Sequence, residues 1–150
     1  MTASREAIMS ALFALVSGPI LSSQSPFVTS SRRMRLWGDV PSGEKPALFM
    51  REIGDEYKGA ERGLPPGVYM GVELYIYIDA GKDQSVDPIS VLNPLIDAVE
   101  AALKGSPVNG RQTLGGLVFH TWIEGKIMKD PGDLDGDGVA VIPVKILATV

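Results

Sequence analysis

The most constraining feature of the sequence is an unbroken alternation of residue types from Val68 to Asp79. Every second position is large and apolar: Val68, Met70, Val72, Leu74, Ile76 and Ile78. A period of two with β-branched and aromatic residues is typical of a strand buried on one face. Burying six such side chains would contribute roughly 9–18 kcal/mol of gross hydrophobic free energy, before conformational entropy is subtracted. We therefore expect this segment to be the central strand of a sheet.

The other face of this strand is unusually aromatic. It carries Tyr69, Tyr75 and Tyr77, with Gly71 and Glu73 between them. Tyrosine combines a large contact area with a polar tip, which suits a protein–protein contact. The alternative is that a helix or loop of the same chain covers the three rings. The pattern alone leaves both interpretations open.

One helix is predicted before this strand in the sequence, and another after it. Residues 4–17 show helical spacing of apolar side chains, with Ser4 as the N-cap and Gly18 as part of the stop signal. Asp87 and Pro88 are suited to the N-cap and first position of a second, amphipathic helix that ends at Gly105. The apolar stripe of this second helix should cover the apolar face of the central strand.

Three further strands are predicted at Pro46–Ile53, Leu117–Lys126 and Val139–Val150. Both faces of Leu117–Lys126 are apolar enough for an inner strand, and Pro143 indicates an edge or a bulge in the last strand. The simplest arrangement is an α+β fold, with a single, mostly antiparallel sheet and two helices packed on one face.

The chain length of 150 residues fits one domain, spanning 1–150. Residues 54–67, which include Tyr57, contain several glycines and prolines and show no periodicity. We therefore expect a long loop at 54–67, joining two strands as an extended hairpin. Loops of this length in compact domains are usually functional or disordered.

The charge balance excludes some classes of partner. The net charge of −4 argues against bulk, sequence-independent nucleic-acid binding. There is no cysteine, which removes disulfides, thiolate catalysis and cysteine-based zinc sites. No apolar run approaches the ~18 residues needed to cross a bilayer, so we expect no membrane partner.

One basic cluster stands out in this acidic chain. It consists of Arg32, Arg33 and Arg35, with Trp37 close behind. One interpretation is a solvated turn in which an arginine pairs with Asp39 or Glu44. The other is a contact with an acidic partner surface or with DNA phosphate.

No convincing catalytic constellation is found, so we expect a non-enzymatic protein without a cofactor. His120 is the only histidine and is predicted to be a packed or interface residue. Glu73 and Glu124 could form a carboxylate pair, but nothing in the sequence fixes their separation.

The segment 133–138 begins like a calcium-binding EF-hand loop, with Asp133, Asp135, Asp137 and Gly138 at suitable spacing. The twelfth position should be a bidentate glutamate but is Val144. An acidic hairpin turn is therefore favoured over a loose surface metal site, and no metal ligand is assigned.

Several segments together resemble a known family. They are Arg32–Trp37, Pro46–Phe49, the tyrosine-rich strand, Val91–Val99, Gln112–Val118, Trp122–Gly125 and Ile142–Val144. In this order and over nearly the full length, the chain resembles the tail terminator proteins of long-tailed bacteriophages, also described as tail completion or minor tail protein U-like proteins. None of these segments is a catalytic motif.

The resemblance implies a structural role in the virion after assembly in the host cytoplasm. Tail terminators form a ring, usually a hexamer, that caps the head-proximal end of the tail tube, stops tube growth and joins the tail to the neck. The expected partners are further copies of the chain, the tail tube protein and the head–tail connector or neck proteins. DNA would pass the lumen without specific binding. The expected interface residues are Tyr69, Tyr75, Tyr77, Arg32, Arg33, Arg35, Trp37 and Tyr57.

Three alternatives remain at this point. A head-closure or neck connector protein belongs to the same structural class. A small metal-binding or hydrolytic domain would use the acidic segment 133–138. A cellular binding module would use a tyrosine-lined groove and remain a monomer.

Overall fold

A computed structural model describes residues 3–18, 25–59, 63, 66–132 and 136–150. The elements in chain order are α1 (Arg5–Ser17), β1 (Thr29–Ser31), β2 (Ala47–Lys58), β3 (Gly67–Asp79), α2 (Pro88–Ala102), β4 (His120–Ile123), β5 (Met128–Asp130) and β6 (Asp137–Ala148). Two single-turn 3-10 helices, Trp37–Asp39 and Ser42–Glu44, lie between β1 and β2. The fold class is α+β, as predicted.

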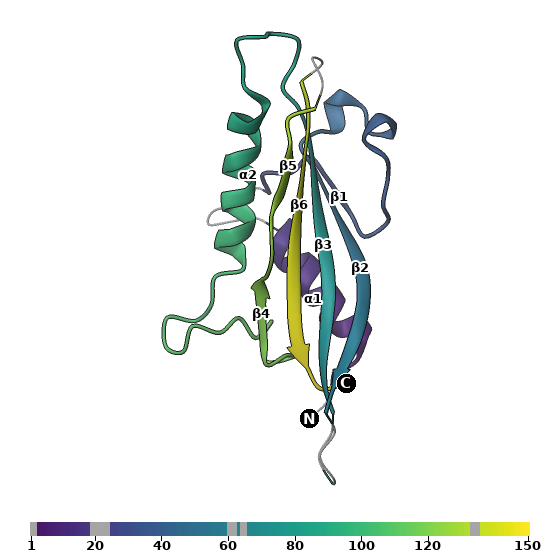
Figure 1. Ribbon diagram of the computed structural model, residues 1–150, viewed down its shortest axis with the longest axis vertical. Coiled ribbons are helices and arrows are strands. Elements are labelled where there is room, and N and C mark those ends of the chain that lie inside the picture. Colours follow the sequence, from purple (N-terminus) through teal and green to yellow (C-terminus); the bar gives the residue numbers. More distant parts are fainter. Residues whose placement is uncertain (1–2, 19–24, 60–62, 64–65, 133–135) are drawn as a thin grey trace.

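The described strands form one six-stranded sheet in the order β1-β2-β3-β6-β4, with β5 beside β6 (Figure 1). All neighbours are antiparallel except β1 and β2, which are parallel over three residue pairs. The segment predicted to be the central strand is β3, and it lies between β2 and β6. Its register with β6 continues without a shift from Val68–Ala148 to Asp79–Asp137.

Both helices pack on one face of this sheet, as predicted, and α1 lies behind the strands in Figure 1. The core consists of apolar residues from the two helices and from alternate positions of β3 and β6. Local chemistry explains where the helices begin. The Ser4 hydroxyl accepts a hydrogen bond from the Ala7 amide, and the Asp87 carboxylate accepts one from the Ile89 amide. In the part of the chain that the structure describes, no helix is long and apolar enough to cross a membrane.

The predicted long loop at 54–67 is largely wrong. Residues 54–58 continue β2, and Gly67 already belongs to β3, so the two strands pair as far as Lys58–Gly67. The predicted hairpin is confirmed, but its arms are longer. The charged residues of this stretch, Asp55, Glu56 and Lys58, lie beyond the three residues of β2 that pair with β1, where the strand is exposed. Charged residues are common on the exposed edge strands of a sheet.

The prediction of an inner strand over Leu117–Lys126 is also wrong. The strand is shorter and, among the described strands, pairs only with β6 at the end of the sheet. Its apolar composition has a different origin. Leu117 and Val118 contribute to the core from the turn that precedes β4, and Ile123 packs against the core from the strand.

Pro143 marks neither an edge strand nor a bulge, because β6 pairs with β3 on one side and with β4 and β5 on the other. The carbonyl of Pro143 accepts a hydrogen bond from the Glu124 amide, just beyond the end of β4. The β5 pairing begins only at Met128–Val141. The missing amide donor of Pro143 therefore falls where the neighbouring strand is interrupted.

The turn after α2 leaves no room for a side chain at Gly105. A Cβ atom there would lie 2.3 Å from the Gly110 carbonyl oxygen and 2.8 Å from the Arg111 nitrogen. We expect Gly105→Ala to lower the free energy of unfolding by about 1–3 kcal/mol, because backbone must move to accommodate the methyl group. Urea denaturation measures this change. The control is Gly38→Ala, where a Cβ meets nothing within 4 Å; equal losses in both variants would contradict the prediction.

Candidate interaction surface

The face of the sheet opposite the helices, called the outer face below, carries the tyrosine side of β3. The pairing of β3 with β2 and β6 shows which side chains lie side by side, in rows, on this face. Tyr77 lies between Ala47 of β2 and Val139 of β6, whereas Tyr69 lies between Glu56 and Leu147. The first row is in the upper half of Figure 1, and the second is in the lower half, near the β2–β3 hairpin. The two halves have different surroundings.

The upper half of the outer face is covered by the chain itself. Met34, Trp37 and Val40 pack against a small cluster formed by Phe49 and Tyr77 with their neighbours. The Tyr77 ring is 5 % exposed, and its hydroxyl donates a hydrogen bond of 2.7 Å to the Arg35 carbonyl oxygen. Burial raises the pKa of Tyr77 above its ordinary value. For Tyr77, the covering layer is thus a loop of the same chain.

Trp37 and Lys45 anchor this covering segment, residues 34–45, on the sheet. The indole nitrogen of Trp37 donates a hydrogen bond of 3.1 Å to the Ile78 carbonyl oxygen. The Lys45 ammonium lies 3.0 Å from the centroid of the Trp37 ring, in a cation–π contact. Burial lowers the pKa of Lys45, and the nearby carboxylates of Asp79 and Asp137 oppose that shift.

The arginine cluster is engaged largely within the chain. Arg32 bridges Glu6 of α1, at 2.7 Å, and Glu52 of β2, at 2.9 Å. The hydrogen bond with Glu6 makes the largest contribution to raising the pKa of Arg32. Arg35 donates to the Asp39 carbonyl oxygen and pairs with the Glu44 carboxylate at 3.3 Å. Pairing of an arginine with Glu44 was one of the predicted alternatives, whereas the contacts of Arg32 were not foreseen.

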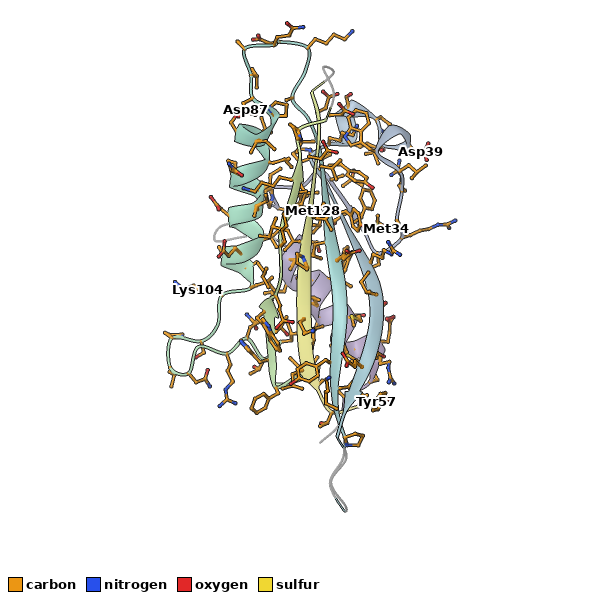
Figure 2. All side chains as sticks on the ribbon, in the orientation of Figure 1. Met34, Asp39, Tyr57, Asp87, Lys104 and Met128 are labelled. Atoms are coloured by element: carbon orange, nitrogen blue, oxygen red, sulfur yellow. The ribbon has the colours of Figure 1, made fainter. Side chains whose placement is uncertain are left out.

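Tyr57 lies away from the other tyrosines. The register shifts between Glu52 and Gly54, which places Tyr57 opposite Val68 on the helix side of the sheet. Its hydroxyl accepts a hydrogen bond of 2.7 Å from Arg5 of α1, whose guanidinium also pairs with Asp55 at 2.6 Å. The ring is 55 % exposed near the lower end of β2 (Figure 2).

The lower half of the outer face is partly accessible to solvent, and its Tyr69, His120 and Trp122 are half-buried. Its side chains, called the open patch below, come from Ile53, Tyr69, His120, Trp122, Lys145 and Leu147. The Tyr69 and Trp122 rings meet edge-on at 6.5 Å, and the His120 and Trp122 rings stack at 4.9 Å. Beside them, Gly54 faces Gly71 across β2 and β3. These glycines leave a groove of about 260 Å³ bounded by Ile53, Tyr69 and Lys145.

Fixed charges border the open patch. Lys145 pairs with Glu124 at 2.9 Å, and the Trp122 indole nitrogen donates to the same carboxylate at 3.2 Å. The hydrogen bond with Lys145 is the main reason that the pKa of Glu124 is lowered, and the same bond raises the pKa of Lys145. Glu73 instead accepts from the Tyr75 hydroxyl and faces Arg51. The two glutamates thus have separate partners and form no acid–base pair.

The sequence predicted Tyr69 as an interface residue and His120 as a packed or interface residue, but Ile53, Trp122, Lys145 and Leu147 were not predicted as interface residues. Trp122 and Lys145 are far from Tyr69 in the chain, and only the β3–β6–β4 register brings them together. His120 was predicted to be a packed or interface residue; it is half-buried, and its Nδ1 accepts a hydrogen bond from the Gln112 amide at 3.2 Å. A second tryptophan on an apolar strand was the only available signal for this surface.

The described residues contain no group of three or more His, Cys, Asp or Glu side chains that could hold a metal ion. Asp133 and Asp135 of the EF-hand-like segment lie outside the described residues. Val144, at the position that should supply the bidentate ligand, is buried in the core. Its side chain could not ligate a cation in any case.

Comparisons with known proteins do not show a family. No family model matches the chain, and no curated protein matches it. Among solved structures, the chain is similar to one described as "Virion of native gene transfer agent (GTA) particle". The identity is 13 %, the TM-score is 0.48, and the match covers 93 % of this chain and 84 % of the other. A likeness this distant carries no argument about function.

Lys45 gives the covering segment a testable pH signature. Because its pKa is lower in the folded state than in the unfolded chain, the folded protein binds fewer protons between these two values. The contribution of Lys45 to stability should therefore rise as pH rises through that window, towards the ordinary lysine pKa of about 10.4. Urea denaturation from pH 7 to 10 should show wild type gaining stability relative to Lys45→Met.

The comparison of the two proteins also controls for Tyr77. Its raised pKa makes stability fall as pH rises through the ordinary tyrosine value, and this loss is shared by both proteins. A stability difference between wild type and Lys45→Met that stays constant with pH would contradict the assignment.

Proposed function

We propose that this chain is a non-enzymatic structural protein of a bacteriophage virion, and that it acts as a tail terminator. In this role, copies of the chain form a ring, hexameric in the family that the sequence resembles. The ring caps the head-proximal end of the tail tube, stops tube growth and joins the tail to the neck. DNA passes through its lumen without specific binding.

The observation that carries the proposal is the unequal covering of the outer face. The upper half is sealed by the segment around Trp37, whereas the open patch exposes aromatic rings next to a groove with a glycine floor. Aromatic clusters bordered by charged groups are typical of protein–protein contacts. The patch contains no catalytic constellation among its described side chains, so it supports binding better than chemistry.

The mechanism needs only complementary surfaces. A ring bound to the last tube ring occupies the surface on which the next tube subunits would add, and growth stops. The opposite side of the ring then offers a surface to the connector or neck proteins. Of the expected interface residues, Arg33 and Tyr57 are exposed, and Tyr69 is half-buried within the open patch, so these three are accessible for such contacts.

The first test is the mass of the purified protein by light scattering at low and high concentration, alone and with isolated tail tubes, with electron microscopy of large species. We expect ring-shaped particles that bind one end of the tubes. Failure to form rings and to bind tubes under all these conditions would overturn the proposal. Assembly in the absence of the protein distinguishes a tail terminator from a head-closure or neck connector protein. Overlong tails support a terminator, whereas tails of normal length that are not attached to heads indicate a neck connector.

A single substitution tests the open patch directly. Trp122→Ser removes the ring that contacts both Tyr69 and His120. We expect binding to tail tubes or to the ring to weaken at least tenfold, while circular dichroism shows a folded protein. The control is Val108→Ser, at a position 91 % exposed in the turn after α2. Normal assembly by Trp122→Ser would exclude the open patch as a contact surface.

A further inference from the structure

We infer that successive copies of the chain join edge to edge, with β4 of one copy pairing with β2 of the next. This inference rests on the proposed function and names the contact that would close the ring. It starts from the two ends of the sheet. At one end, β1 covers only residues 47–49 of β2. At the other end, β4 pairs with β6 alone among the described strands.

The two open edges lie at the same level of the sheet. One row of register partners runs from Gly54 of β2 through Gly71 and Lys145 to Trp122 of β4. This row crosses the lower half of the sheet, which is also the half that carries the open patch (Figure 1). A neighbouring copy could therefore meet both strands without a large shift along them.

Strand direction also fits such a contact. Each neighbouring pair from β2 through β3 and β6 to β4 is antiparallel, so β4 runs opposite to β2. Rotation about an axis roughly parallel to the strands preserves the direction of every strand. The next copy would then present a β2 that is antiparallel to β4, which is a regular pairing geometry. A heterologous contact of this kind closes into a ring when the rotation permits it.

The edge of β4 that faces away from β6 has a groove beside it. The Glu124 amide bonds to the Pro143 carbonyl on β6. By the alternation of an antiparallel ladder, the backbone groups of Thr121 and Ile123 point away from β6; Thr121 is buried, whereas Ile123 is half-buried and therefore the accessible one of the two. A groove of about 510 Å³, lined by β4 and by the last turns of α2 with Lys104, lies there. Thr121 lines this groove, and its hydroxyl oxygen is buried with no hydrogen-bond partner among the described residues.

The open edge of β2 carries apolar side chains on both sides of the sheet. Ile53 is 53 % exposed and contacts Gly71 on the outer face, whereas Tyr57 is 55 % exposed on the helix side. Exposed apolar residues on an edge strand favour pairing with another chain. In the joined sheet, Ile53 would extend the open patch of the neighbouring copy. Tyr57 would lie one row beyond His120, near the lower end of the paired strands (Figure 2).

Cysteine cross-linking tests the pairing, because the chain has no cysteine of its own. Glu56→Cys places a thiol on β2, and His120→Cys places one on β4, in the next outer-face row after that of Gly54 and Trp122. Within one copy these strands are separated by three strand spacings, about 14 Å, so a short cross-linker joins different copies preferentially. The double variant should give a ladder of covalent multimers that ends at the ring number. Each single variant should remain monomeric on a denaturing gel.

The outcomes separate this inference from the proposed function. Rings that show no covalent ladder would overturn the edge pairing and leave the terminator role standing. Efficient dimers from either single variant would indicate a two-fold contact and would also overturn it. Absence of rings, with and without tail tubes, would overturn both proposals.

A backbone substitution provides an independent test. Ile123→Pro removes an amide donor that points away from β6, and Ile123→Ala loses most of the same side chain but keeps the amide. We expect Ile123→Pro to reduce assembly at least tenfold relative to Ile123→Ala, with similar circular dichroism for the two variants. Equal assembly by both variants would contradict pairing at this edge.

Discussion

The pairing of β3 with β6 is the interaction on which the rest of the structure depends. It aligns an apolar face on both strands over its whole length, and that face receives both helices. A slip of one residue would place Leu74 opposite Val141, so Val141 would turn into the core and Ile142 out of it. The large burial difference between the two faces therefore fixes the register. The register in turn decides which side chains meet on the outer face.

Ion pairs play a secondary and local part around this core. Arg5 and Arg32 connect α1 to β2 through Asp55 and Glu52, at the side of the sheet where β1 is short. These pairs are partly exposed, and such pairs contribute little to stability. Their value is in orientation, because two arginines hold one helix across an edge strand. The same contacts leave the backbone of that strand uncovered.

The predictable part of the fold is the part determined by local chemistry. Alternation identified β3, and Ser4 and Asp87 identified where the helices begin, because each signal lies within a few residues of its effect. The extension of β2 was missed since its charged residues reflect an exposed edge, which depends on distant pairing. The open patch was missed for the same reason. Tyr77 and Tyr69 look equivalent in the sequence, but the segment around Trp37 docks over Tyr77, through the Trp37–Ile78 hydrogen bond among other contacts.

Pro143 has a consequence for how the sheet opens. Because the strand beside β6 is interrupted there, β4 and β5 are held to β6 by separate sets of hydrogen bonds. Local unfolding of β4 therefore need not disturb β5, or the reverse. The protein can exchange the amide hydrogens of these two segments on independent timescales while the β3–β6 pair stays closed. The far side of the sheet thus behaves as two short units on one rigid support.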